Sequence, residues 1–268
     1  MGISNKAFVV TGAGSGIGKA LVLALLAKGA KVAAVDVHEK TLLQLTDTVG
    51  TKNKHLSTHV VDISDKKSVK NLPDAVLAQH RSIDAIINNA GIIQPFVTVN
   101  DLEYSSIEKV FNINFYGTLY MTKAFLPHLL KRPEAYIVNV SSMGGFLPVP
   151  GQSIYGASKA AVKLLTEGLY AELLDTPVNV SIVFPGATQT NITQNSGVTM
   201  PTGATEQSKK FNMLSADVAA EIIVKGIEKN KPQIFVGKDS KMMNRLYRLN
   251  PVFATKLIAK QMKSLLQT

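Results

Sequence analysis

Residues 7–36, AFVVTGAGSGIGKALVLALLAKGAKVAAVD, contain a complete strand, turn, helix and strand within about 30 residues. The run AFVVT is rich in β-branched and aromatic residues and predicts a strand, and KALVLALLAKG has the apolar spacing of a helix that ends at Gly29. KVAAV predicts a second strand, which ends at Asp36. A unit of this length and order predicts two parallel strands joined by a crossover helix.

The same alternation continues along the chain. It predicts further strands at 56–61, 85–88, 136–140, 178–184 and 234–236, and helices at 40–49, 66–80, 155–174 and 216–229, with two helices sharing 102–130. Short apolar strands that alternate with helices are typical of a parallel sheet covered on both faces. We therefore expect a doubly wound α/β (Rossmann) fold, in a single domain formed by residues 1–268.

Two segments depart from this alternation. Residues 187–213 are rich in Thr, Ser, Asn and Gly without clear periodicity, and we expect them to form a substrate loop or lid. Residues 238–268 are a C-terminal extension, in which Asn250 and Pro251 predict the cap and first turn of an amphipathic helix. One side of this helix carries Ala254, Leu257, Ile258, Gln261, Met262 and Leu265. We favour packing of that side on the protein itself or on a neighbouring subunit over contact with a membrane surface.

Composition excludes several classes of function. The chain has 268 residues, 46% of them hydrophobic, and no cysteine, which excludes disulfides and thiolate chemistry. Much of its net charge of +10 comes from residues 238–268, which carry seven Lys or Arg and one Asp. No basic patch with interleaved aromatic residues occurs elsewhere, so a nucleic-acid partner is not expected. The N-terminus enters a strand without a leader-like segment, which favours a cytoplasmic protein.

The glycine turn has the chemistry of a phosphate site. Gly12, Gly16 and Gly18 follow the first strand and open the first helix, where missing side chains let a pyrophosphate approach the backbone. Asp36, at the end of the second strand, can accept hydrogen bonds from both ribose hydroxyls of NAD, and its charge would repel the extra phosphate of NADP. We therefore expect NAD as the cofactor, with NADP disfavoured; Ser15 and Val37 add no basic residue for that phosphate.

A second motif carries proton chemistry. Tyr155 and Lys159 are four residues apart at the start of a predicted helix, so their side chains lie on one face. An ammonium beside a phenol lowers the pKa of the phenol from about 10 toward the range of a general base. Ser142 follows an apolar strand, which would deliver its hydroxyl to the carboxyl edge of the sheet. The three groups could act together on a substrate oxygen.

These two motifs together closely resemble the classical short-chain dehydrogenase/reductase family, over roughly residues 6 to 237. The resemblance implies that Tyr155 is the acid/base, that Ser142 orients the substrate oxygen and that Lys159 lowers the pKa of Tyr155 and binds the nicotinamide ribose. It implies that Asn114 holds a water linking Lys159 to solvent. A homo-oligomer, a tetramer or dimer formed through the helices around Asn114 and Tyr155, is also implied.

The resemblance also assigns cofactor contacts. Asp62 and Ile63 would flank the adenine ring, and Thr190 would contact the nicotinamide carboxamide. Asn88, with Ala90 and Gly91, would support the sheet beside the cofactor. The full set of expected cofactor-binding residues is Gly12, Ser15, Gly16, Ile17, Gly18, Asp36, Asp62, Ile63, Asn88, Ala90, Gly91, Tyr155, Lys159, Pro185, Gly186, Thr188 and Thr190.

The substrate is less constrained by the sequence. The expected pocket wall, 92–96, 144–153 and the loop, is largely apolar; its named members are Ile93, Phe146, Leu147, Val149, Val198 and Met200. It favours a hydrophobic secondary alcohol or its ketone. Lys209 and Lys210 leave open a 3-oxoacyl substrate on an anionic carrier. A non-catalytic NAD-binding redox sensor is the alternative from another class, and a methyltransferase is disfavoured because it would not need the Tyr-x-x-x-Lys pair.

Two other mechanisms find no support. His55 and His59 are four residues apart, but His59 falls in a predicted strand and no nearby acid completes a ligand set, so no metal site is expected. Ser142 lacks the G-x-S-x-G turn of a serine hydrolase.

Overall fold

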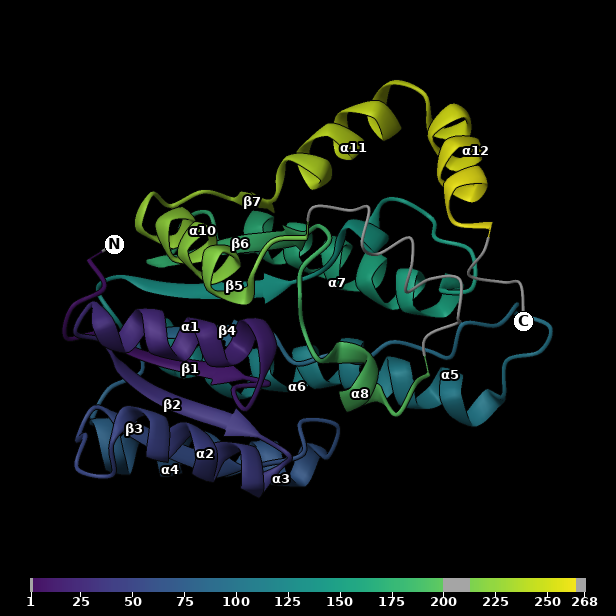
Figure 1. Cartoon of the computed structure of the whole chain (residues 1–268). Helices are drawn as coiled ribbons and strands as arrows, with labels where there is room; N and C mark the ends of the chain where they lie inside the picture. The colour runs from purple at the N-terminus through teal and green to yellow at the C-terminus, as the bar shows by residue number, and fades with distance from the viewer. Residues whose placement is uncertain (1, 200–212, 264–268) are drawn as a thin grey trace.

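A seven-stranded parallel sheet forms the centre of the computed structural model, which describes residues 2–199 and 213–263. The strands lie in the order β3-β2-β1-β4-β5-β6-β7 (Figure 1). Their bounds are β1 Ala7–Thr11, β2 Lys31–Asp36, β3 Leu56–Val60, β4 Ala85–Asn88, β5 Ala135–Val140, β6 Val178–Pro185 and β7 Gln233–Val236. The order reverses between β1 and β4, and this reversal opens a crevice at the carboxyl ends of the strands. The doubly wound fold is confirmed.

Helices cover both faces of the sheet because the strand side chains alternate between two apolar cores. Phe8 and Val10 of β1 point into one core, with residues of α1, α2 and α10, whereas Val9 points into the other, with residues of α3, α4, α6 and α7. These helices are α1 Gly16–Ala27, α2 Glu39–Val49, α3 Lys66–Lys70, α4 Leu72–His80, α6 Thr118–Leu129, α7 Ser153–Glu172 and α10 Ala216–Glu228. The helix expected at 66–80 is thus two helices, divided at Asn71.

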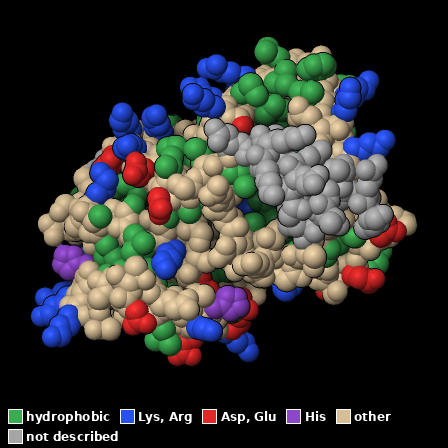
Figure 2. Space-filling view, in the orientation of Figure 1, with side chains coloured by type: hydrophobic (Ala, Val, Ile, Leu, Met, Phe, Trp, Pro, Cys, Tyr) green, Lys and Arg blue, Asp and Glu red, His purple; other side chains and the backbone are tan. Residues whose placement is uncertain are grey.

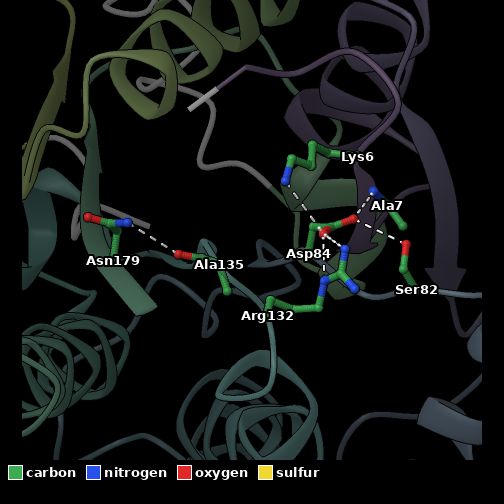
Figure 3. Close-up of polar contacts among 7 residues, drawn as sticks. All are labelled: Lys6, Ala7, Ser82, Asp84, Arg132, Ala135 and Asn179. Carbon is green, nitrogen blue, oxygen red and sulfur yellow. Dashed lines mark hydrogen bonds and ion pairs between the residues drawn. The ribbon is translucent and has the colours of Figure 1, made fainter. Parts of the chain in front are cut away.

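A buried carboxylate joins the amino ends of β1 and β4 (Figure 3). Asp84 is 1% exposed and accepts hydrogen bonds from the Ala7 backbone N–H at 2.8 Å and the Ser82 hydroxyl at 3.2 Å. Arg132, just after α6, places its Nη2 2.8 Å from the carboxylate, and Lys6 lies at 3.8 Å. Both cations reduce the cost of burying this charge. The cluster fixes the end of the sheet opposite the crevice.

The two helices expected within 102–130 are present, but no loop separates them. A continuous helical run extends from Tyr104 to Leu129, as α5 Tyr104–Phe111, a π-helical turn η1 Asn112–Gly117, and α6. The wider turn leaves the run unbroken, so no loop residue marks the change of hydrogen-bond pattern in the sequence. π-Turns of this kind insert locally into α-helices and often lie at functional sites.

The loop after β6 also contains structure that was not expected. A short helix, α8 Ile192–Ser196, interrupts the segment 187–213, and it ends at Gly197, whose φ of +68° lies in the left-handed region. Residues 200–212 of this segment lie outside the described residues.

The C-terminal extension contains two helices, of which only the second was expected. α11 Lys238–Leu249 follows β7 directly, and α12 Pro251–Gln261 begins after Asn250, whose side chain accepts a hydrogen bond from the Phe253 N–H at 2.9 Å. Ala254 and Ile258 of α12 are buried against Leu147 and Met243 of the same chain. The inward side of α12 therefore packs on its own subunit.

Candidate active site

A cleft of about 490 Å³ lies at the carboxyl ends of the central strands, beside the reversal between β1 and β4. Most of the residues predicted from the two motifs line it. These are Gly12, Ser15, Gly16, Ile17, Asp36, Asp62, Ile63, Ala90, Gly91, Ser142, Tyr155, Lys159, Pro185, Gly186, Thr188 and Thr190. Gly18, Asn88 and Asn114 do not line it. Residues far apart in the sequence are therefore brought to one cleft.

The glycine loop has no room for side chains. Gly12 and Gly16 have φ values of +65° and +51°, which glycine adopts without strain. A Cβ on Gly12 would lie 2.9 Å from the Ala90 Cα, and one on Gly18 would collide with the Gly12 carbonyl oxygen. Gly18 thus serves the packing of α1 on the turn rather than the cleft wall. The amino end of α1 consequently faces the cleft, in the geometry that binds phosphate groups.

Asp36 is held rigidly at the end of β2. Its Oδ2 accepts a hydrogen bond from the Gly14 N–H at 2.8 Å, and its Oδ1 accepts one from the His38 N–H at 3.0 Å. Each carboxylate oxygen has further acceptor capacity, because an ionised carboxylate offers about four acceptor sites. The carboxylate is therefore preorganised as an acceptor for two hydroxyl groups.

Tyr155 and Ser142 meet on the cleft wall. Tyr155 stands in the first turn of α7, and Ser142 follows β5, where its Oγ accepts a hydrogen bond from the Gly144 N–H at 3.0 Å. Burial raises the pKa of the Tyr155 phenol above its ordinary value, and a hydrogen bond from the Ser142 hydroxyl partly offsets this by lowering that pKa. The pKa of Tyr155 is therefore shifted upward in the protein alone, because removing the phenol from water is the larger of these two effects.

Lys159 lies one turn further along α7, with its side chain in the interior. It is 4% exposed, and its Nζ donates a hydrogen bond to the Val140 carbonyl at 3.0 Å. Burial lowers the pKa of Lys159 to about 8. A Cβ on Gly91 would lie 2.9 Å from this Nζ, so a side chain at position 91 would require the end of Lys159 to shift.

Asn114 lies behind the cleft wall, in the π-turn η1. Its Oδ1 accepts a hydrogen bond from the Ile92 N–H at 2.8 Å, and its Nδ2 donates to the Ile92 carbonyl at 2.9 Å and to the Ser158 hydroxyl at 2.9 Å. A Cβ on Gly91 would lie 3.1 Å from its Oδ1. Asn114 and Lys159 therefore approach the same glycine from two sides, and Asn114 also fixes the segment after β4 against α7.

Asn88 is placed in the sheet interior. Its Nδ2 donates hydrogen bonds to Asn139 Oδ1 at 2.8 Å and to Thr122 Oγ1 at 3.3 Å. The neighbouring Asn89, which was not predicted as a site residue, lines the cleft and donates from its Nδ2 to the Thr11 carbonyl at 3.0 Å. Adjacent residues in a strand point to opposite sides, so identifying the cleft residue of the Asn-Asn pair required the register of β4.

Helix α8 covers the cleft from the side of the long loop. Asn195 Nδ2 donates a hydrogen bond to Ser15 Oγ at 2.7 Å, across the glycine turn. Ser196 Oγ accepts one from the Ile93 N–H at 3.0 Å. Asn191, Ile192 and Asn195 line the cleft with Thr190, whose side chain approaches Gly16. The contacts of α8 were missed because they join segments about 100 to 180 residues apart.

The predicted substrate wall is only partly correct. Ile93 lines the cleft, but Phe146 and Leu147 belong to the apolar cluster that packs on α11 and α12. Val149 and Val198 are half-buried and do not line the cleft. Met200, Lys209 and Lys210 lie outside the described residues. Phe146 and Leu147 pack against the C-terminal extension instead of the cleft, and α11 of that extension was not predicted from the sequence.

Gln94 is a positioning residue that sequence reasoning missed. It is fully buried, and its Oε1 accepts hydrogen bonds from the Ile154 N–H at 2.7 Å and from the Tyr155 N–H at 3.0 Å. Its own carbonyl accepts a hydrogen bond from Gln152 Nε2 at 2.8 Å. Gln94 thus satisfies free amides at the start of α7, where Tyr155 stands. No local pattern marks a cap that comes from 60 residues away.

Ile92 of the expected wall also lines the cleft. The remaining unpredicted cleft residues are Val35, Val37, His38, Val61, Lys109, Ile113, Val140 and Ser141. Among residues 2–199 and 213–263, no group of three His, Cys, Asp or Glu side chains could hold a metal ion.

Comparison with known proteins places this site in a family. The model of the short chain dehydrogenase family matches residues 6–200. SadH of Mycobacterium tuberculosis, which is named as an oxidoreductase, is 35% identical over 263 residues, or 95% of this chain and 94% of that protein. The chain belongs to the short-chain dehydrogenase family. As a member of this family, the protein is an oxidoreductase that binds a nicotinamide cofactor.

Two solved structures show how closely this short-chain dehydrogenase follows the family fold. A Burkholderia phymatum member in complex with NAD has a TM-score of 0.86 and 27% identity, covering 94% of this chain and 96% of that chain. A Burkholderia cenocepacia member in complex with NADP has a TM-score of 0.80 and 25% identity, covering 96% and 99%. Since both cofactors occur on this fold, the choice between them depends on the residues at the ribose site.

Proposed function

We propose that this short-chain dehydrogenase is NAD-dependent and interconverts a hydrophobic secondary alcohol and its ketone. The observation that carries the proposal is the convergence of Ser142, Tyr155 and Lys159 on the cleft that also contains the glycine loop and Asp36. A proton-transfer group and a nucleotide site in one cleft fit coupled transfer of a proton and a hydride. When bound, the nicotinamide gives or takes the hydride.

The preference for NAD is supported by the state of Asp36. A fixed carboxylate with spare acceptor capacity suits a ribose with two free hydroxyls, and its negative charge opposes a phosphate at the same position. Gly12, Gly16 and the start of α1 would hold the pyrophosphate, because they line the cleft and the glycines place no side chain between it and the backbone.

The protein groups would divide the proton chemistry. Tyr155 exchanges a proton with the substrate oxygen, and the Ser142 hydroxyl hydrogen-bonds to that oxygen. A positive charge near the phenol must overcome the effect of burial on the pKa of Tyr155. Lys159 contributes such a charge while it is protonated. Asn114 holds the Ile92 backbone and Ser158, which keeps α7 and its two functional side chains in place.

A hydrophobic substrate is supported by the cleft wall near the loop, where Ile92, Ile93 and Ile192 contribute apolar side chains. No arginine of the described ranges lines the cleft, so a carboxylate substrate has no bidentate partner there. The carrier-linked alternative relied on Lys209 and Lys210, and no described residue adds support for it.

The proposal is tested with the purified protein, NAD or NADP, and secondary alcohols graded from short and polar to long and apolar. We expect reduced-nicotinamide absorbance to rise faster with NAD, and turnover to increase with apolar size. Faster turnover with NADP would refute the role of Asp36, and a preference for polar or anionic alcohols would refute the substrate class.

We also propose a homo-oligomer. Its support is the exposure of large apolar side chains on η1 and α7, namely Tyr116, Leu164 and Tyr170, at 42%, 70% and 42%. Light scattering should give a mass that is a multiple of 28.8 kDa. A monomer at micromolar concentration would contradict it.

A further inference from the structure

The α11–α12 corner, residues 238–261, projects from the edge of the sheet beyond β7 (Figure 1). It is firmly attached to the fold. Met243 of α11 and Ala254 and Ile258 of α12 pack against Leu147, and each is at most 7% exposed. The Asp239 carboxylate accepts a hydrogen bond from the Ala187 N–H at 2.8 Å. The corner therefore presents a fixed outer surface.

The outer surface of the corner carries large apolar side chains. Leu249, at the end of α11, is 85% exposed, and Val252 and Phe253, in the first turn of α12, are 63% and 53% exposed. Met242, seven residues before Leu249 and therefore on the same face of α11, is 62% exposed. Figure 2 shows hydrophobic side chains gathered over this projecting part of the molecule. Apolar residues grouped in this way are characteristic of interaction sites rather than of ordinary surface.

Basic side chains surround this apolar tip, as the Lys and Arg atoms near it in Figure 2 illustrate. All of the Lys and Arg residues of the corner and of the turn after it are exposed: Lys238, Lys241, Arg245, Arg248, Lys256, Lys260 and Lys263. Within the described part of the chain, none of the seven forms an ion pair. The one acid of the segment, Asp239, is engaged with Ala187. The positive charge of the corner is thus available to a partner.

We propose that the α11–α12 corner docks this enzyme on an anionic membrane surface. Leu249, Val252 and Phe253 enter the boundary between headgroups and acyl chains, and the surrounding Lys and Arg side chains contact lipid phosphates and carboxylates. A lipid surface satisfies both halves of the patch at once, because it is apolar just below a layer of negative charge. A nucleic acid would leave the apolar tip exposed.

The sequence favoured packing of the apolar side of α12 on protein over contact with a membrane. The inward face of α12 is occupied by its own subunit, and the docking surface is the opposite, outer side of the corner. No helix in the described ranges is long and apolar enough to cross a bilayer. The enzyme would therefore lie on the membrane rather than span it.

The test is flotation of the full-length protein with vesicles of phosphatidylcholine alone or with a quarter phosphatidylserine. We expect binding to the anionic vesicles, with weakening at high salt. The variant Leu249→Ser, Val252→Ser, Phe253→Ser should lower the partition coefficient at least tenfold. Replacing Lys241, Arg245, Arg248 and Lys256 by Gln should also lower it at least tenfold, since each basic residue contributes on the order of fivefold.

Matched controls separate the corner from general surface effects. Leu43→Ser, Val60→Ser, Leu174→Ser removes apolar side chains that are 59%, 55% and 62% exposed elsewhere, and should bind vesicles like the unmodified protein. Lys52→Gln with Lys54→Gln is the corresponding charge control. Melting temperature shows that each variant is folded.

The absence of tryptophan from the chain allows insertion to be measured directly. Phe253→Trp should give a fluorescence blue shift on anionic vesicles, whereas Tyr104→Trp, at a position 82% exposed on α5, should give none. Protein that stays in the aqueous fraction, or a Ser-substituted tip that binds as well as the original, would overturn the proposal. Binding to an oligonucleotide or an acidic protein without binding to vesicles would overturn it as well.

Discussion

Replacing Gln94 by Ala should destabilise the protein and slow catalysis together. The change removes the acceptor for two backbone amides at the start of α7, those of Ile154 and Tyr155. Leaving a buried amide without a partner costs about 1–3 kcal/mol. Both amides are only partly buried, so we expect about 2–4 kcal/mol off the free energy of unfolding. Because one of the amides belongs to Tyr155, we also expect kcat to fall about 10- to 100-fold through misplacement of its phenol.

The assay combines urea unfolding with steady-state kinetics and calorimetric titration of NAD. Gln94→Glu is the matched variant, because it keeps the acceptor oxygens and adds a negative charge that favours a helix amino terminus. It should recover most of the stability and most of kcat, while NAD affinity changes little in either variant. The capping role of Gln94 would be refuted if Gln94→Ala unfolds at the same urea concentration with the same kcat, or if the Glu variant is as impaired as the Ala variant.

Three further predictions concern charge. Asp36→Ala should lower the ratio of kcat/KM for NAD to kcat/KM for NADP by at least about tenfold, since it removes both the ribose acceptor and the repulsion of the phosphate. An unchanged ratio would contradict the proposed ribose site. Arg132→Ala should lower the free energy of unfolding by about 2–3 kcal/mol, because it leaves the buried Asp84 with Lys6 at 3.8 Å as its remaining cation. Lys163→Ala, at a surface pair, should cost less than about 1 kcal/mol. Equal losses of the two variants in urea unfolding would refute the stabilising role of the buried pair. Burial lowers the pKa of Lys159 to about 8, below its value in the unfolded chain, so the folded state binds fewer protons between about pH 8 and 10. The free energy of unfolding should therefore rise with pH in that window, and Lys159→Met should lack this rise. Parallel pH profiles of the two proteins would contradict the lowered pKa.

Local patterns were sufficient to predict the sheet and most of the cleft. The glycine turn, Asp36 and the Tyr155–Lys159 pair each combine a residue type with a spacing that only a strand end or a helix face provides. The strand order fixes where their side chains meet, and parallel strands bring their carboxyl ends to one edge. The separate motifs therefore converge without any long-range information about individual contacts.

The features that escaped prediction depend on contacts between distant segments. Gln94 caps a helix from another loop, and α8 is held by Ser15 and by the Ile93 backbone. Helix α11 has a strongly basic composition. Its buried side could not be predicted, because Met243 is covered by Leu147 and α12, which come from other parts of the chain. The effect of burial on the pKa of Tyr155 also escaped prediction, because it depends on the segments that remove the phenol from water.

The proton-transfer role of Tyr155 is tested most directly by comparing the original protein with Tyr155→Phe for NAD binding and for NADH formation with the best alcohol of the panel. We predict that the variant binds NAD with affinity within about twofold of the original and loses at least about 100-fold in kcat, since it retains the ring and lacks only the proton-transfer group. Turnover at the original rate in Tyr155→Phe would contradict the account. Tight NAD binding with no turnover by the original protein on any alcohol or ketone would instead favour a cofactor-sensing role.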